Sequence, residues 1–524
     1  MRYRFKGIKT NIDVPMSDLP VIVADKLRIP VADIMDFEVR RKSVHSRKKP
    51  YIQFVYTVDF GTAGKLRIPK KYSSDINIVD IESERTIPPS TGSIPLASRP
   101  VIVGMGPAGI FAALELAKAG FCPLVLERGP AMDGRIKAVE QFRKNRVLDP
   151  EANMLFGEGG AGTFSDGKIG TGIKDSLIRE VLKEFCDAGA GDDIMYLAKP
   201  HIGTDILRKV IVNLRRKIQD FGGEILFDTR LEALVTEDGR LKAVDIRRKG
   251  AAAERIETDV LILAIGHSAR DTFAMINSSG LSMQQKPFSI GVRMEHPQAL
   301  IDEAQYGKEN AGKLPPADYR INYKASNGRG VYSFCMCPGG EVVVCSTRDG
   351  ELCVNGMSNR KRDSGTANSG ILCDVRTEDF GSDDVLAGVR FQEKYERLAF
   401  RNGGCDFTAP ACSMDAFLNG APDSAKVTDS LPSFAAEAIR EAVPDFARRI
   451  KGYDDPSAIV TAVETRSSSP VRIVRDENGE SNIKGVYPAG EGAGYAGGIT
   501  SAACDGIRAA WHIIERYHLQ QPGR

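Results

Sequence analysis

Short apolar runs that end in glycine or an acidic residue divide the middle of this chain into strand-like and helix-like segments. The run at 101–103 leads into a glycine-rich turn, and residues 110–120 then repeat apolar side chains at helical spacing. A second apolar run, at 123–126, ends at Glu127. Strands that alternate with helices are typical of a parallel sheet. The pattern therefore predicts an α/β domain that begins near residue 98.

The turn after the first strand carries glycines at the spacing that holds a dinucleotide. Gly104 permits the tight turn, Gly106 lets the backbone approach a pyrophosphate, and Gly109 lets the helix pack close to the strand. Pro107 and Ala108 open a helix whose N-terminus offers free N–H groups to phosphates. Glu127 follows at roughly the distance of 20 residues where an acid meets a ribose. The acid argues against a 2′-phosphate, so the unit predicts FAD or NAD rather than NADP.

A second glycine-rich turn near the C-terminus decides between FAD and NAD. Residues 485–489 are predicted to form a short strand, residues 490–498 are rich in glycine, and a helix is predicted from Ile499. A helix N-terminus reached through glycines is again a site for an anion or a flavin ring. An NAD-only dehydrogenase has no need of this distant loop, whereas FAD extends across its domain and meets it. FAD is therefore the predicted cofactor.

The rest of the chain divides into further units. Strand-like runs and one helical stretch precede a linker rich in proline and serine at 86–95, which predicts a small α+β N-terminal domain. The segment that follows the predicted flavin fold carries no second dinucleotide fingerprint, and its apolar runs predict an antiparallel sheet with helices. The predicted domains are 1–97, an α+β N-terminal domain; 98–285, the first part of a Rossmann-type FAD-binding domain; 286–455, an inserted α+β cap or substrate domain; and 456–524, the C-terminal part of the FAD-binding domain.

Within the first part of the FAD-binding domain, the pattern predicts two helices, three shorter strands and one buried strand. The segments are helices at 134–145 and 206–218, a strand pair at 224–231 and 233–236, a strand at 241–248 and a buried strand at 258–266. The loop at 157–172 is so rich in glycine that it indicates close approach of a ligand, with a mobile surface loop as the alternative.

The inserted segment is expected to cover the flavin and shape the substrate pocket. Crevices between domains are where ligand pockets preferentially form. The substrate is therefore expected to enter between the insert, the loop 157–172 and the loop 490–498. Bulky side chains at Gly162 or Gly497 should then block flavin reactivity.

Four further segments carry a resemblance to a known family: 156–167 (Phe-Gly-Glu-Gly-Gly-Ala-Gly-Thr-Phe-Ser-Asp-Gly), 263–270, 332–340 and 464–472. Over nearly its whole length the chain resembles bacterial FAD-dependent dehydrogenases of unassigned role. It is more distantly similar to geranylgeranyl reductases and to flavoproteins that modify tRNA. The resemblance implies a flavoprotein fold with bound FAD, and it implies no particular substrate.

The resemblance also adds residues to the predicted site. In similar proteins Glu491 lies near the ribityl chain, the segment at Leu231 brings backbone atoms to the adenine, and Gly266 ends the strand on the pyrophosphate side. The predicted cofactor-binding residues are Gly104, Gly106, Pro107, Ala108, Gly109, Glu127, Arg128, Gly162, Leu231, Gly266, Gly490, Glu491, Gly497, Gly498 and Ile499. No residue is assigned as a catalytic acid or base, and no metal ligand is predicted.

Five polar residues each allow two interpretations. Cys335 and Cys337 are either a redox pair or packed thiols, since side chains two apart on a strand point the same way but a disulfide there would be strained. His267 either faces the flavin or caps the end of a strand. Arg466 and Arg472 either hold an acidic substrate or the pyrophosphate, or form surface salt bridges.

Composition narrows the class of protein. The 524 residues carry 71 basic and 69 acidic side chains, a net charge of +2, which gives no overall attraction to nucleic acid or membranes. No run reaches the roughly 18 apolar residues of a membrane span, and the first residues lack the apolar stretch of a secretory signal. The ten cysteines show no zinc-binding spacing and are expected to be reduced thiols of a cytoplasmic protein.

These observations predict an FAD-dependent oxidoreductase that transfers hydride between a small organic substrate and bound FAD, with NAD(P)H as a candidate electron donor. A tRNA-modifying flavoprotein and a flavin-binding interaction protein are the alternatives. The balanced charge counts against the first alternative, and the complete FAD fingerprint counts against the second. No membrane or nucleic-acid partner is expected.

Overall fold

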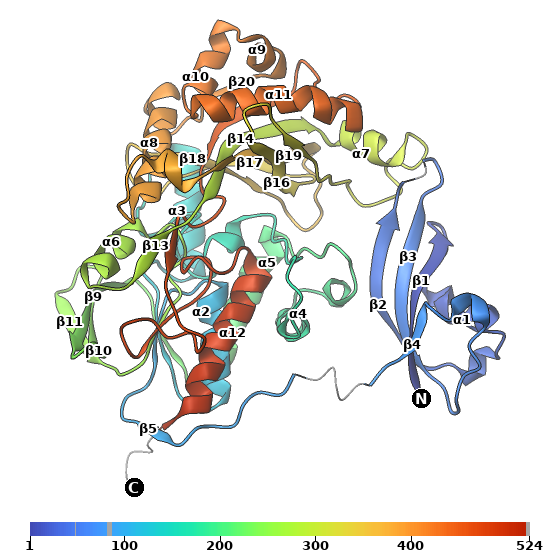
Figure 1. Cartoon of the computed structure of the whole chain (residues 1–524), viewed down its shortest axis with the longest axis horizontal. Helices are drawn as coiled ribbons and strands as arrows, with labels where there is room; N and C mark the ends of the chain where they lie inside the picture. Colours follow the sequence, from blue (N-terminus) through green and yellow to red (C-terminus); the bar gives the residue numbers. More distant parts are fainter. Residues whose placement is uncertain (48, 81–85, 520–524) are drawn as a thin grey trace.

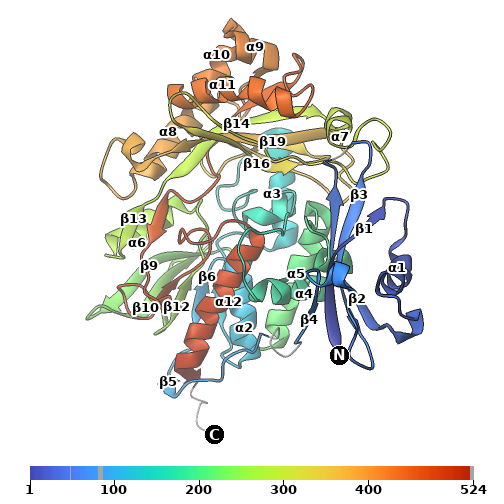
Figure 2. The ribbon, with the colours of Figure 1, turned by 45° about the vertical axis from the view of Figure 1, so that its right-hand side comes forward.

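A five-stranded parallel sheet forms the centre of the molecule, with a small domain beside it and an antiparallel sheet above it (Figures 1 and 2). The computed structural model describes residues 1–47, 49–80 and 86–519. Within these ranges, no helix is both long enough and apolar enough to cross a membrane. The architecture is the predicted one: a Rossmann-type α/β domain, an inserted α+β domain and an α+β N-terminal domain.

The N-terminal domain is a four-stranded antiparallel sheet in the order β2-β3-β1-β4, with one helix packed beside it. Its elements are β1 (Arg2–Asn11), α1 (Leu19–Leu27), β2 (Met35–His45), β3 (Gln53–Gly61) and β4 (Ile76–Ile78). Tyr56, Val58 and Phe60 alternate along β3 and are buried, as expected for a strand with one face on a core. The linker that follows contains β5 (Ile94–Leu96), which pairs with β24 (Tyr517–Leu519) at the other end of the chain.

The parallel sheet has the order β23-β12-β6-β7-β8, and all its pairings are parallel. Its strands are β6 (Val101–Val103), β7 (Leu124–Leu126), β8 (Glu224–Leu226), β12 (Leu261–Leu263) and β23 (Val486–Pro488). Every residue of the four strands other than β8 is buried, which is typical of a parallel sheet covered on both faces. Because β23 pairs with β12, the C-terminal segment completes the domain that residues 98–285 begin.

Helices α2 and α12 lie against each other beside this sheet (Figure 1). The helices of the domain are α2 (Pro107–Lys118), α3 (Met132–Asn145), α4 (Leu177–Asp187), α5 (Thr204–Asp220), α6 (Arg270–Ser278) and α12 (Ile499–Arg516). A Cβ atom at Gly506 of α12 would lie 2.0 Å from the Ala108 carbonyl oxygen of α2. Glycine is therefore needed where the two helices cross.

One prediction about this domain is wrong. Residues 224–226 do not pair with 233–236: they form β8 and join the parallel sheet beside β7. Residues 229–237 instead form one strand, β9 (Thr229–Glu237), in a three-stranded antiparallel sheet with β10 (Arg240–Arg248) and β11 (Ala253–Glu257). The break comes at Asp228, whose φ of +50° turns the chain out of the extended conformation.

The insert is built on a six-stranded antiparallel sheet in the order β15-β16-β19-β14-β21-β20. The strands of this sheet are β14 (Phe288–Pro297), β15 (Asn322–Lys324), β16 (Gly330–Cys337), β19 (Thr366–Val375), β20 (Ala411–Ser413) and β21 (Ile459–Glu464). A separate two-stranded hairpin consists of β17 (Glu341–Cys345) and β18 (Cys353–Met357). The helices of the insert are α7 (Gln298–Tyr306), α8 (Ala387–Asn402), α9 (Met414–Asn419), α10 (Ala425–Thr428) and α11 (Ser433–Arg449). Helices α9, α10 and α11 lie above the sheet, on the side away from the parallel-sheet domain (Figures 1 and 2).

The β17–β18 hairpin packs toward the parallel-sheet domain. Val343, Cys345 and Met357 share a buried apolar cluster with Met154 and Ile499 of that domain. The chain leaves through β13 (Met283–Gln285) and returns through β22 (Val471–Ile473), and these two strands pair with each other. The insert's sheet takes its strand β21 from beyond residue 455, where the sequence places the boundary.

Candidate functional site

The turn between β6 and α2 has the geometry that its glycines predict. Gly104 has a φ of +99°, and its N–H donates to the Leu126 carbonyl at 2.8 Å. A Cβ atom there would lie 2.4 Å from the Ala264 carbonyl oxygen of the neighbouring strand end. A Cβ atom at Gly109 would lie 1.9 Å from the Gly104 carbonyl oxygen. Only glycine therefore lets α2 begin this close to the sheet.

One pocket joins the two glycine-rich turns. It encloses about 1040 Å³ with its open mouth included. The turn after β6, the end of β12 and the first turn of α12 all line it. The predicted residues that line it are Gly104, Gly106, Pro107, Ala108, Glu127, Arg128, Gly162, Leu231, Gly266, Gly490, Glu491, Gly498 and Ile499.

Gly109 and Gly497 lie outside that lining. Gly109 packs α2 onto the turn, as its contact with Gly104 shows. Gly497 is exposed, and a Cβ atom there would have no neighbour within 4 Å. A bulky side chain at Gly497 is therefore expected to point into open space and not into the pocket.

Glu127 bonds the backbone of the turn between β6 and α2. Its carboxylate accepts the N–H of Met105 and the N–H of Gly129, each at 2.9 Å, and the residue is only 4% exposed. Each carboxylate oxygen has a second lone pair after these bonds. Glu127 thus shapes the pocket wall and keeps acceptor capacity for ribose hydroxyls, which stays the predicted role.

Arg128, the next residue, is already bonded to protein carboxylates. Its guanidinium donates to Glu151 at 2.6 Å and to Asp271 at 2.9 Å, and it lies 4.3 Å from the centroid of the Phe156 ring. These contacts fix the side chain at the pocket wall. The guanidinium of Arg128 would therefore contact a ligand in one fixed orientation.

Arg135 of α3 supports the glycine-rich loop and was not predicted from the sequence. It is fully buried and donates to five carbonyl oxygens of residues 153–160, at 2.6–3.2 Å. The glycine-rich loop is therefore anchored by a buried cation where it passes the pocket. A signal was present: Arg135 occupies the apolar stripe of α3 with Met132, Val139 and Phe142.

His267 follows the end of β12 and lines the same pocket. Its Nδ1 lies 3.4 Å from a Glu491 carboxylate oxygen. Its Nε2 is buried and has no hydrogen-bond partner among the described residues. A buried ring nitrogen of this kind normally has a partner, so the imidazole offers a polar contact to a ligand in this pocket.

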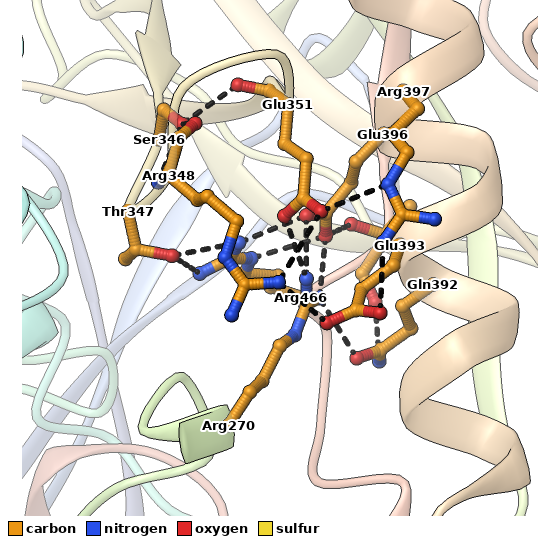
Figure 3. A network of polar contacts seen from close by, with 11 residues as sticks. Arg270, Ser346, Thr347, Arg348, Glu351, Gln392, Glu393, Glu396, Arg397 and Arg466 are labelled. Atoms are coloured by element: carbon orange, nitrogen blue, oxygen red, sulfur yellow. Dashed lines mark hydrogen bonds and ion pairs between the residues drawn. The ribbon is translucent and has the colours of Figure 1, made fainter.

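A buried charge network joins the parallel-sheet domain to the insert (Figure 3). Arg270, at the start of α6, and Arg466 lie 2.7 Å and 2.8 Å from the two carboxylate oxygens of Glu396 on α8. Arg270 also lies 3.4 Å from Glu351 in the β17–β18 loop. Burial by itself would raise the pKa of Glu396, but Arg270 and Arg466 hold that pKa well below its usual range. The network holds the insert on the loop that carries His267.

This network corrects the surface interpretation of Arg466. Its side chain is 5% exposed and bonded to a buried carboxylate, so it forms no surface salt bridge, and it is not among the residues that line the pocket. Contact with an acidic substrate stays a prediction. Arg472, by contrast, lies beside Tyr495, with its guanidinium 5.1 Å from the ring centroid. Charge alone could not separate these two arginines in the sequence.

The insert approaches the pocket from one side. Among the described residues, none from 286–455 lines the pocket itself. An adjoining cavity shares Arg128, Phe156 and Ser268 with it and takes Thr347 and Glu351 from the β17–β18 loop. The insert therefore forms part of the wall of this adjoining cavity. Direct contact of the insert with a flavin stays a prediction.

Comparison with known proteins agrees with a flavin site. Residues 287–467 match the family described as "FAD-dependent protein, C-terminal domain-like". An uncharacterized protein of Clostridium beijerinckii is 42% identical over 538 residues, which cover 99% of this chain and 100% of that protein.

Solved structures show weaker likeness. A flavin-dependent brominase is 13% identical, with a TM-score of 0.38 over 79% of this chain and 78% of the other. A geranylgeranyl bacteriochlorophyll reductase-like protein of Thermoplasma acidophilum is also 13% identical, with a TM-score of 0.35 over 80% and 78%. Scores this low carry no argument about function.

Proposed function

This chain belongs to a family of FAD-dependent flavoproteins, and on that basis we propose that it is an oxidoreductase that transfers hydride between a small organic substrate and bound FAD. When bound, FAD supplies the hydride exchange at its ring, and the protein supplies position and electrostatics. The observation that carries the proposal is the single pocket that joins the N-terminus of α2 to the N-terminus of α12.

The residues of the pocket fit an extended dinucleotide. The first turn of α2 offers N–H groups and the positive end of a helix dipole to the phosphates. Glu127 faces the same pocket with free lone pairs for a ribose. Gly498 and Ile499 place a second helix N-terminus at the far end, where a flavin ring would gain hydrogen bonds. The unpartnered Nε2 of His267 belongs to a residue that lines the same pocket.

We place the substrate beside the flavin end of the pocket, between the glycine-rich loop and the insert. Arg135 bonds the loop, and the Glu396 network bonds the insert to the parallel-sheet domain, so both walls of this space are held by buried contacts. A closed space would keep water away from the reacting atoms. The substrate is a small organic molecule in this proposal, and NAD(P)H is the candidate electron donor.

Anaerobic stopped-flow reduction tests the proposal directly. The purified yellow protein would be mixed with NADH and then with NADPH, and the flavin absorbance followed. Bleaching by either donor, and reoxidation by a member of a panel of small organic acceptors, is expected. A flavin that no nicotinamide donor or organic substrate reduces would contradict the proposal and favour a binding role.

Replacing Glu127 by alanine is expected to weaken FAD binding by about 1–3 kcal/mol, the scale of hydrogen bonds to a charged group. The change removes the predicted ribose acceptor and leaves the buried N–H groups of Met105 and Gly129 without a partner. The dissociation constant would be measured by titrating apoprotein with FAD. Glu115→Ala is the control, since Glu115 lies on α2 but bonds Lys118 and Trp511 away from the pocket. Equal FAD affinity in the two variants would refute the role of Glu127.

A further inference from the structure

Two cysteines of β16 lie beside a lysine of the glycine-rich loop, where the insert meets the parallel-sheet domain. The Lys168 ammonium lies 3.6 Å from the Cys337 sulfur, and an Arg293 guanidinium nitrogen of β14 lies 3.9 Å from the same sulfur. Arg293 also donates to the Cys335 carbonyl oxygen at 3.0 Å. Two cations from different elements therefore surround a pair of thiols that the proposed hydride transfer does not use.

The backbone at this pair is irregular. The register between β16 and β19 shifts between Phe334 and Cys337, and Cys335 has a φ of +43°. A β-bulge re-aims a side chain, and positive φ outside glycine is kept where the surroundings enforce it. The result is a division of the pair: Cys335 is partly exposed, whereas Cys337 is buried behind it.

The bulge is also expected to shorten the distance between the two cysteine Cα atoms. Two residues of a regular strand span about 6.6 Å, at the upper end of the Cα separations of roughly 4.4–6.8 Å that disulfides bridge. The extra residue of a bulge shortens that span. Both cysteines are free thiols in this structure.

Charged groups from several other elements surround the pair. On the glycine-rich loop, Lys168 forms an ion pair with Asp166, which also pairs with Arg362. On the other side, Arg293 pairs with Glu464 of β21. The Cys337 thiol donates to the Cys335 carbonyl oxygen at 3.1 Å. The neighbouring Cys337 thiol, with Lys168 and Arg293, lowers the pKa of the Cys335 thiol well below its usual value, against burial. The Cys335 sulfur, together with burial, raises the pKa of Cys337.

We propose that Cys335 and Cys337 form a reactive dithiol site that takes a low-molecular-weight disulfide. The Cys335 thiolate attacks one sulfur of that disulfide, which forms a mixed disulfide and releases one thiolate. The Cys337 sulfur then attacks the Cys335 sulfur, forms the Cys335–Cys337 disulfide, and gives its proton to the second leaving thiol. The small disulfide is reduced by two electrons and the protein dithiol is oxidised by the same two.

Alkylation of the FAD-loaded protein tests the first half of this proposal. Limiting iodoacetamide at pH 7, followed by peptide mass spectrometry, should label Cys335 about tenfold or more faster than Cys186, since one pKa unit is a tenfold change in thiolate fraction. Cys186 is a matched control because it is also partly exposed, while burial and nearby aspartates raise its pKa to about 11. Labelling of Cys335 no faster than Cys186 would overturn the proposal.

Two variants of Lys168 test whether its positive charge activates Cys335. Lys168→Met should slow labelling of Cys335 about tenfold, and Lys168→Arg should keep most of the rate, because the cation stabilises the thiolate. Flavin absorbance of each variant confirms that the fold and cofactor are retained. Equal labelling rates in the Met and Arg variants would remove Lys168 from the site.

Oxidised glutathione tests the second half. The wild-type protein should lose two hydrogen masses and carry no adduct, whereas Cys337→Ser should keep one glutathionyl group on Cys335. A stable adduct on the wild-type protein, or no reaction at Cys335, would contradict a dithiol site. The readout does not involve flavin reduction, so this result stands apart from the test of the proposed function.

Discussion

Replacing Glu396 by alanine is expected to lower the free energy of unfolding by about 3–5 kcal/mol, the cost of removing one partner of a buried ion pair. Glu396 is completely buried, and its two carboxylate oxygens bond Arg270 and Arg466 from two different segments. Without the carboxylate, two guanidinium groups stay buried with Glu351 as the nearest remaining acid. Urea unfolding followed by circular dichroism measures the effect.

Arg390 provides the control on the same helix. It pairs with Asp384, and both side chains are about half exposed. Exposed pairs contribute about 0–1 kcal/mol, so Arg390→Ala should change stability little. Glu396→Gln keeps the shape of the side chain and removes only its charge. If Glu396→Gln were as stable as the wild type, the charge of the network would not matter.

The pH dependence has a definite sign. The pKa of Glu396 is lowered in the folded protein, so its charge stabilises the fold fully above its ordinary pKa of about 4.3. As the pH falls below that value, the unfolded chain takes up the proton first, and the stabilisation is lost. The stability difference between the wild type and Glu396→Gln should therefore be constant from pH 6 to 8 and narrow below about pH 4. A difference as large at pH 3 as at pH 7 would contradict this account.

The parts of the fold that the sequence predicts are those with local signals. The glycine turn at 104–109 and the glycine-rich turn before Ile499 follow directly from residue type and spacing, because each strand, turn and helix lies within about 20 residues. The pairing of β8 was predicted wrongly because the apolar run continues past Asp228, where the backbone turns. A single left-handed residue leaves little trace in an apolar pattern.

The features that the sequence could not predict depend on distant contacts. Arg270, Glu396 and Arg466 belong to three segments that only the closed fold brings together. The spacing of Cys335 and Cys337 was visible, but the bulge that separates an accessible thiol from a buried one depends on pairing with β19. Arg135 was the exception, since an arginine in an apolar helical stripe is a local sign of a buried polar contact.

Replacing Gly162 by phenylalanine is expected to weaken FAD binding by about 3 kcal/mol, which is more than a hundredfold in the dissociation constant. Gly162 and Ile499 both line the pocket, and a Cβ atom at Gly162 would already lie 2.8 Å from the Ile499 Cγ1 atom. A phenyl ring must therefore displace the first residue of α12 or fill the pocket. FAD content after purification and titration of the apoprotein measure the loss.

Gly497→Phe is the matched control. It places the same ring on the second glycine-rich segment, at a glycine that does not line the pocket. A Cβ atom at Gly497 has open space around it, so FAD affinity should change by no more than about 0.5 kcal/mol. Circular dichroism establishes that both variants fold. If Gly162→Phe kept normal FAD content, the glycine-rich loop would not border the cofactor. If Gly497→Phe lost FAD instead, the flavin would lie farther along the C-terminal turn than the pocket lining indicates.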